Sequence, residues 1–289
     1  MYSTEDRKLL QIVRSLCTTV RQPLKFERVK TWLKQFETGP EQTLALLLLR
    51  HLIYRTNSQI ESSLAQALRR MALHYVQDEY REQFTWQEII AEKTNLYFSF
   101  GPPATDLTPP GKSGELIVRL LKHKFQIPGS KIHYPDGVIT LESDERYLLV
   151  DDGTFTGLQL DDYLTRFSSW TSLAGRAGIV VAIAHEEALE FLAKKYPHIP
   201  VFYGEKMTAQ DGLVKLSQTW IETARWPYKA TTPLETYNEI VTTKAKFDCA
   251  EPLGFGSLGL LVAYEHGVPD DSLRLLWSKS PTWAPLFDR

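Results

Sequence analysis

The stretch "YLLVDDGTFTGLQL", from Tyr147 to Leu160, decides how the chain folds. An apolar run leads into two adjacent aspartates, Asp151 and Asp152, and a Thr-Gly pair begins at Thr156. A uniformly apolar run is typical of a parallel strand that is buried on both faces. The small residues behind it predict a turn, and "LQLDDYLTRFSSW" has the spacing of an amphipathic helix. We therefore expect a strand, a turn and a helix here.

Strand and helix patterns alternate on both sides of this stretch. Apolar runs predict strands over 95–100, 146–152, 178–184 and 199–204. Amphipathic spacing predicts helices over 115–126, 158–170 and 186–196. Because the strand runs do not alternate between apolar and polar residues, the pattern favours an α/β fold with a parallel sheet covered by helices on both faces.

The N-terminal third of the chain has helical spacing almost throughout. Residues 41–55 are apolar on nearly all sides and are expected to form the central helix of a small bundle. We therefore expect an N-terminal helical subdomain over 1–94 and an α/β domain over 95–289. The C-terminal tail "PTWAPLFDR" is expected to pack against the sheet.

The composition is that of an ordinary globular protein. The chain has 289 residues, 43% of them hydrophobic, and a net charge of -2, so no global charge argues for a polyanionic partner. Its two cysteines cannot by themselves make a thiolate zinc site. No apolar run is long enough to span a bilayer and the start lacks a signal-peptide core, so we expect a cytoplasmic protein without a membrane partner.

The paired aspartates predict a ligand site. In a parallel sheet, ligands bind at the carboxyl ends of the strands, and the N-terminus of the following helix favours a phosphate. Carboxylates accept hydrogen bonds from neighbouring hydroxyls, either directly or through Mg²⁺ and its waters. Asp151 and Asp152 with the turn behind them therefore predict a site for a phosphorylated ribose. The alternative interpretation is a simple strand end with a helix cap.

The same residues resemble the phosphoribosyl-diphosphate motif of type I phosphoribosyltransferases. The resemblance implies that Asp151 and Asp152 hold the ribose and Mg²⁺ as catalytic residues. It implies a 5′-phosphate loop made of Thr154, Phe155, Thr156, Gly157, Leu158 and Gln159. The chain departs from the family at Leu158 and Gln159, where a small residue and a closing Thr or Ser are usual. Phe155 stands where some members have a catalytic Asp.

A second matching segment lies earlier in the chain. "PGKSGELIVRLLK" follows a predicted strand and opens a helix, as the diphosphate loop of these enzymes does. The resemblance implies that Lys112, Ser113 and Gly114 bind the diphosphate. A solvated loop lysine is the other interpretation of Lys112.

The whole chain is similar to the phosphoribosyltransferase-like proteins of prokaryotic conflict systems, some of which accompany retron or other antiphage modules. The similarity lies in "VKTWLKQF", "LLVDDGTFTGLQ" and "EHGVPDDSLRLLW". It implies a type I phosphoribosyltransferase-like core and a role in defence.

Two classes of function remain open. The first is an enzyme that binds phosphoribosyl diphosphate or a related nucleotide with Mg²⁺, and either transfers the phosphoribosyl group or cleaves a nucleotide's glycosidic bond. The second is a non-catalytic module that senses a nucleotide or binds a partner. Metal-dependent phosphodiester hydrolysis is weaker, because no further carboxylates accompany the aspartate pair at convincing spacing.

Other residues are candidates for the acceptor pocket or for partner binding. His185 follows a predicted strand, and Glu265 and His266 precede a Gly-Val-Pro-Asp-Asp segment. Each also has an ordinary interpretation, as a helix-start histidine or as turn residues. A basic run over 21–34 is either a solvated helix face or a surface for nucleic acid or a defence-system partner protein.

Overall fold

A computed structural model describes residues 3–75, 84–93, 95–100, 113–133, 145–166, 173, 175–248 and 250–288. The chain forms two compact units. One contains residues 58–207, and the other is built from both ends of the chain, up to Asn57 and from Thr208 onward. Within the described ranges, no helix is both long enough and apolar enough to cross a membrane.

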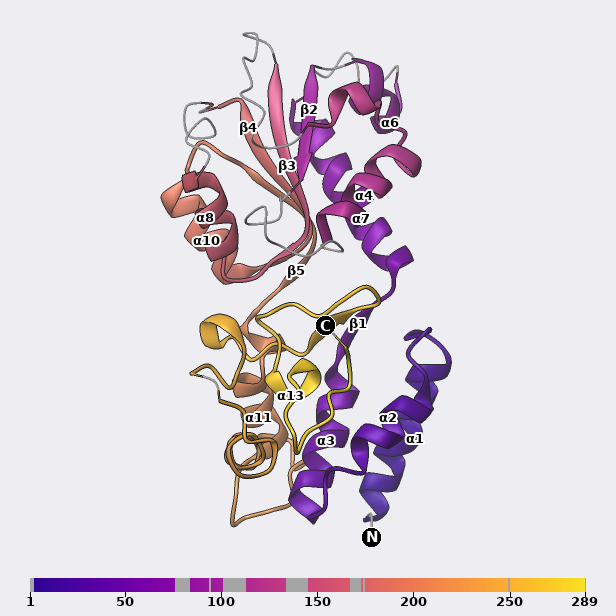
Figure 1. The fold of residues 1–289 in the computed structure, drawn as a ribbon, viewed down its shortest axis with the longest axis vertical. Coiled ribbons are helices and arrows are strands. Elements are labelled where there is room, and N and C mark those ends of the chain that lie inside the picture. Colours follow the sequence, from indigo (N-terminus) through magenta and orange to yellow (C-terminus); the bar gives the residue numbers. More distant parts are fainter. Residues whose placement is uncertain are drawn as a thin grey trace. The chain divides into compact units, whose positions relative to one another are not determined.

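A four-stranded parallel sheet forms the centre of the 58–207 unit (Figure 1). Its strands, in order across the sheet, are β2 (Leu96–Phe100), β3 (Arg146–Thr154), β4 (Ala177–His185) and β5 (Val201–Met207). Every residue of β4 is buried, as is usual for a strand whose sequence is apolar as far as Ala184. The α/β class and the parallel sheet are thus confirmed.

Helices cover both faces of this sheet. Those on one side are α8 (Leu158–Arg166) and α10 (Glu186–Lys195), and those on the other are α4 (Asn57–Tyr75) and α7 (Ser113–His123) (Figure 1). The first pair shares a cluster of buried side chains with the sheet, including Leu149, Val181 and Leu192. The described residues of this unit also form the short helix α6 (Trp86–Glu88), a π-helical segment at Ile89–Lys93 and a 3-10 turn at Gly129–Lys131.

Helix α4 lies directly against β5. Gly204 of β5 makes this approach possible, because a Cβ atom there would come within 2.0 Å of the Ser63 carbonyl oxygen. Arg70 of α4 donates a hydrogen bond of 2.6 Å to the carbonyl of Tyr203. The Ser63 hydroxyl donates to the carboxylate of Glu205. Backbone contact and side-chain bonds together hold α4 on this face of the sheet.

The other unit combines helices from the two ends of the chain. Its helices are α1 (Thr4–Thr18), α2 (Phe26–Leu33), α3 (Gly39–His51), α11 (Leu213–Glu222), α12 (Pro233–Glu239) and α13 (Arg274–Trp277). Two short parallel strands, β1 (Ile53–Arg55) and β6 (Val262–Tyr264), pair with each other. Single turns span Ala209–Asp211, Ile240–Ala245 and Phe255–Ser257. Helix α3 is buried on nearly all sides, as its sequence predicts.

Aromatic side chains from both ends of the chain meet in the core of this unit. Trp32 and Phe36, from and just after α2, contact Trp283 edge to face, with ring centroids 6.3 and 5.3 Å apart. Phe287 stacks on Tyr54 of β1 at 5.9 Å. The C-terminal tail is therefore a core segment of the unit that contains the N-terminal helices.

Three expectations differ from this structure. The chain does not divide at residue 94: the N-terminal helices share their core with residues from 208 onward, and α4 belongs mainly to the unit with the four-stranded sheet. Residues 53–55 form a strand rather than the end of a helix, because the Ile53 N–H donates to the Leu261 carbonyl. The tail packs on α2 and β1, in the core of the unit formed by the chain ends, whereas its sequence predicts packing against the α/β sheet.

Candidate functional site

Asp151 and Asp152 lie near the carboxyl end of β3. Among the described residues, β2 pairs with β3 as far as Phe100 opposite Val150, and β3 pairs with β4 as far as Thr154. Both aspartates therefore lie beyond the last described residue of β2. Asp151 is 7% exposed and Asp152 is partly exposed. This difference is expected in a strand, where successive side chains point to opposite faces.

The turn behind the aspartates is fixed by a glycine. Gly157 has a φ of 79°, in the left-handed region that glycine adopts without strain. A Cβ atom at Gly157 would come within 2.9 Å of the Phe191 ring, so the turn packs closely on α10. The Gly157 carbonyl accepts the first bond of α8, from the Asp161 N–H at 2.9 Å. Gly157 thus lets β3 turn sharply into α8.

The N-terminus of α8 follows at once. The first N–H groups of a helix have no acceptor within the helix and attract anions. The Thr156 hydroxyl accepts a hydrogen bond of 3.4 Å from the Leu158 N–H. The turn can therefore offer backbone N–H groups and one hydroxyl to a phosphate.

The expected phosphate-loop residues have different surroundings. The side chains of Thr154 and Phe155 are buried, at 5% and 6% exposure. Leu158 is 43% exposed and Gln159 is exposed. Because Phe155 packs inside the protein, its position can contribute to a ligand through its backbone and supplies no acid or base.

The connections of β2 and β3 run in opposite directions. After α7 the chain returns beside β2, where Ile132 forms a parallel bridge with Phe98. After α8 it returns as β4, on the other side of β3. Where the connections of two neighbouring parallel strands lead to opposite sides in this way, α/β proteins bind ligands in the crevice at the carboxyl ends of those strands. The aspartate pair lies at this switch point.

The expected diphosphate segment is described in part. Lys112 lies outside the described residues. Ser113 begins α7, as predicted, and Gly114 is buried in its first turn. The segment therefore leads into the helix that follows β2, one of the two strands at the switch point.

The residues described around the aspartates do not form a metal site with three or more protein ligands. In the described ranges, no group of three or more His, Cys, Asp or Glu side chains comes together. Two carboxylates alone still suit Mg²⁺, which proteins usually hold through one or two carboxylates, several waters and the phosphates of a substrate. The donor set therefore fits a metal that arrives with a phosphorylated ligand.

His185 ends β4 and caps α10. Its Nδ1 accepts a hydrogen bond of 3.2 Å from the Glu187 N–H, as expected of a helix-start histidine. Accepting at Nδ1 places the proton of the neutral ring on Nε2. Nε2 is buried without a hydrogen-bond partner among the described residues, and the side chain is 1% exposed.

Glu265 and His266 belong to the other unit. They follow β6, and both are held by Asn57. The Asn57 N–H donates to Glu265 Oε2 at 2.9 Å, and Asn57 Oδ1 lies 3.2 Å from His266 Nδ1. The sequence pattern did not single out Asn57, because its partners lie more than 200 residues away.

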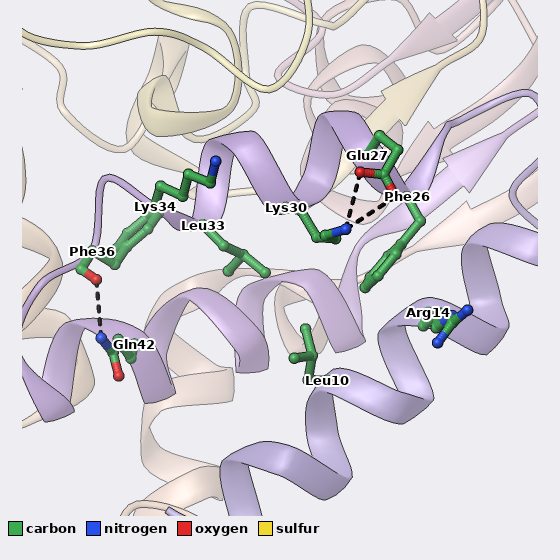
Figure 2. Close-up of a pocket in the computed structure, with 9 residues that line it drawn as sticks. All are labelled: Leu10, Arg14, Phe26, Glu27, Lys30, Leu33, Lys34, Phe36 and Gln42. Carbon is green, nitrogen blue, oxygen red and sulfur yellow. Dashed lines mark hydrogen bonds and ion pairs between the residues drawn. The ribbon is translucent and has the colours of Figure 1, made fainter. Parts of the chain in front are cut away.

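Two cavities stand out among the described residues, and both lie in the unit formed by the chain ends. One, of about 560 Å³, lies between α1, α2 and α3 (Figure 2). Leu10, Leu33 and Phe36 give it apolar walls, and Arg14 and Lys34 stand at its edge. The other, of about 490 Å³, is lined by Glu265 and His266. Neither contains the aspartate pair.

The 58–207 unit thus has a parallel sheet with a carboxylate pair and a sharp glycine turn at its switch point, the place where α/β proteins bind ligands. The comparison with protein families agrees. The PRTase-CE family model matches residues 29–289, nearly the whole chain, and the protein therefore belongs to the PRTase-CE family and is phosphoribosyltransferase-like. No curated protein matches the chain in sequence. Helix α1 precedes the matched region.

Proposed function

We propose that the 58–207 unit binds phosphoribosyl diphosphate, or a nucleotide with the same ribose 5-phosphate group, at the carboxyl ends of β2 and β3. Asp151 and Asp152 accept hydrogen bonds from the ribose hydroxyls. Backbone N–H groups of residues 155–159 hold the 5′-phosphate.

One observation carries this proposal: the sharp turn from β3 into α8. The turn puts two carboxylates and a helix N-terminus within seven residues of each other, and Gly157 fixes it by its positive φ and its close packing on α10. Ribose hydroxyls need acceptors, and a phosphate needs N–H donors. A ligand that carries both ribose hydroxyls and a phosphate can therefore bond to the carboxylates before the turn and to the N–H groups after it.

The residues of the chain would act by orientation. Asp151 and Asp152 would fix the sugar, and Lys112, Ser113 and Gly114 would hold the diphosphate. Mg²⁺ at the aspartates would neutralise charge on the phosphate oxygens. Holding the sugar and the leaving group in place lowers the barrier to breaking the bond at C1′, by orientation and by stabilisation of the departing anion.

The second candidate is a binding module without chemistry. The buried Phe155 favours it, because this position cannot supply the acid or base that some phosphoribosyltransferases have there. An assay for diphosphate release separates the two: an enzyme releases it when an acceptor base or nucleotide is supplied, and a sensing module binds the ligand unchanged.

Calorimetry tests the binding site. Phosphoribosyl diphosphate with Mg²⁺ is titrated into the wild type and into the Asp151→Asn/Asp152→Asn variant. We expect saturable binding to the wild type and a loss of about tenfold or more in the variant, because two charged acceptors are removed. Asp162→Asn is the matched control, since Asp162 lies on the exposed face of α8; it should bind like the wild type.

The outcome is decisive when the proteins are folded, as circular dichroism can establish. A folded wild type that does not bind would overturn the proposal. Equal binding by the double variant would place the ligand elsewhere.

A role in antiphage defence is a further part of the proposal, and it rests on the resemblance described above. Cells that carry the natural operon should lose protection against phage when Asp151 and Asp152 are replaced by Asn. If plaque counts are unchanged by the two replacements, the protection against phage does not depend on the aspartate site.

A further inference from the structure

The cavity beside Glu265 and His266 has the position of a ligand site. It has a volume of about 490 Å³, within the range of small-molecule pockets. It lies just beyond the carboxyl ends of the parallel strands β1 and β6, which end at Arg55 and Tyr264. The start of α2 and the C-terminal tail supply its other walls. All of these segments belong to one compact unit.

The floor of the cavity is aromatic and little exposed. Tyr54, Tyr264 and Phe287 line it and are only 4–7% exposed. Each of these rings belongs to a near-parallel pair. Tyr54 stacks on Phe287 with an interplanar angle of 17°, and Tyr264 stacks on His266 with an angle of 26°. His266 is exposed, so the second pair extends from the floor toward the rim. Flat stacked rings of this kind suit a planar heterocycle.

The rim is polar, and two of its groups are held in place. Asn57 fixes both Glu265 and His266 by hydrogen bonds of 2.9 and 3.2 Å. The Glu265 N–H also donates to the Arg55 carbonyl, which anchors the backbone. One carboxylate oxygen of Glu265 is engaged by Asn57, but a carboxylate has about four acceptor sites. Glu265 can therefore accept further donors from a ligand.

The charges around the cavity balance. Lys25 and Arg28 are matched by Glu265 and Asp288, and Arg28 pairs with Asp288 at 2.8 Å. Burial, reinforced by the negative charge of Glu265, raises the pKa of Tyr54 to about 12. Tyr54 therefore stays neutral at physiological pH. A rim without net charge over a buried aromatic floor favours a neutral ring over an ionised one.

We propose that this cavity binds a nucleobase with two adjacent N–H donors, as in guanosine, with the donor edge on Glu265 and the ring on the Tyr264–His266 pair. Guanine presents a ring N–H and an exocyclic amine side by side, and a carboxylate can accept both in parallel. Adenine presents no such pair, and hypoxanthine lacks the exocyclic amine. The proposal does not depend on the aspartate site, because every residue that carries it lies in the other unit.

Titration calorimetry with the full chain tests the proposal. Guanosine, inosine and adenosine are compared up to about 1 mM, the usual limit of specific weak binding. We expect saturable binding of guanosine that is roughly tenfold tighter than that of inosine and tighter still than that of adenosine, since each lost charged hydrogen bond costs about this much. Glu265→Gln should reduce guanosine binding about tenfold, because the amide has a single acceptor oxygen.

Two controls separate this site from others. Glu27→Gln removes an exposed carboxylate of the same unit, at the edge of the α1–α3 cavity, and should leave guanosine binding unchanged. The Asp151→Asn/Asp152→Asn variant should also bind guanosine normally, so that failure at the aspartate site leaves this result intact.

Three results would overturn the proposal: no saturable binding of guanosine to the folded wild type, equal affinity for adenosine, or unchanged affinity in a folded Glu265→Gln variant. If that variant does not fold, the order of the three nucleosides on the wild type still decides the question.

Discussion

Gly157 is the residue on which the proposed phosphate turn depends. Substitution by Ala forces a side chain into the left-handed region and brings its Cβ within 2.9 Å of Phe191. We expect Gly157→Ala to lower the free energy of unfolding by about 2 kcal/mol or more, from strain and overpacking together. Urea unfolding followed by circular dichroism measures the change.

Gly175 provides a matched control for this prediction. Its φ of 78° is almost the same, but a Cβ there meets no atom of the described residues within 4 Å. Gly175→Ala should therefore cost only the backbone strain, about 1 kcal/mol. Equal losses in the two variants would mean that the packing of the turn on α10 contributes nothing.

His51 makes one part of the stability depend on pH. Burial lowers the pKa of His51 below its ordinary value of 6.5, and the nearby positive charges of Arg50, Arg225 and Arg21 lower it further. Because the unfolded chain then binds the proton more readily than the folded one, stability must fall as the pH drops below about 6.5.

Two variants isolate this effect. His51→Gln keeps a donor for the Leu47 carbonyl, which lies 2.9 Å from His51 Nδ1, and it does not titrate. The loss of stability between pH 7 and pH 5 should be smaller in this variant than in the wild type. His198→Gln, at an exposed histidine, should leave the slope unchanged. An unaltered slope in His51→Gln would contradict the prediction.

The stability of the 58–207 unit depends on the close contact between helix α4 and strand β5. Gly204→Ala would place a Cβ 2.0 Å from the Ser63 carbonyl oxygen, so the helix must move away from the sheet. We expect a loss of about 2 kcal/mol or more in thermal or urea unfolding. Among the described residues, a Cβ at Gly129 in the same unit meets the end of the Lys122 side chain alone, at 3.8 Å, so Gly129→Ala should be nearly neutral.

The sequence predicts those elements whose signal is local. The run ending at Asp151 and Asp152 has its strand, its turn and its helix within about twenty residues, and the structure contains all three. Strand β1 is different. Its three residues lie one residue after the apolar helix α3, and the pairing that makes them a strand is with β6, about 200 residues later. Periodicity carries no signal for such a pairing.

The two candidate sites also differ in how far their residues lie from one another in the sequence. The aspartate pair and the Thr-Gly turn are neighbours in sequence and form a recognisable pattern. Tyr54, Asn57 and Glu265 come together only through the pairing of β1 with β6. The sequence suggested Glu265 and His266 as candidates, but it could not predict that Asn57 holds them both.

At the scale of the molecule, the chain ends share one core and the middle of the chain has another. Trp283 joins the C-terminal tail to α2 in the first core. Trp283→Ala should cost about 3–5 kcal/mol, as is usual for a buried aromatic residue. Hydrogen exchange should then speed up in α2 and α3, while β3 and β4 keep their protection, because local stability follows the cooperative unit.

The reciprocal variant completes this test. Val181→Ala weakens the core of the four-stranded sheet, since Val181 is fully buried there. It should speed exchange in β3 and β4 and leave α2 unaffected. Uniform acceleration across both units in either variant would mean that the chain unfolds as a single cooperative body.

The sharing of one core by the two ends also sets an order for biosynthesis. Residues 58–207 carry the four-stranded sheet with helices on both faces, so this unit can form while translation continues. Helices α1 to α3 emerge from the ribosome before residues 58–207, but they reach their aromatic partners only after the segment around Trp283 has been made. These apolar helices are thus made before the 58–207 unit and buried after it.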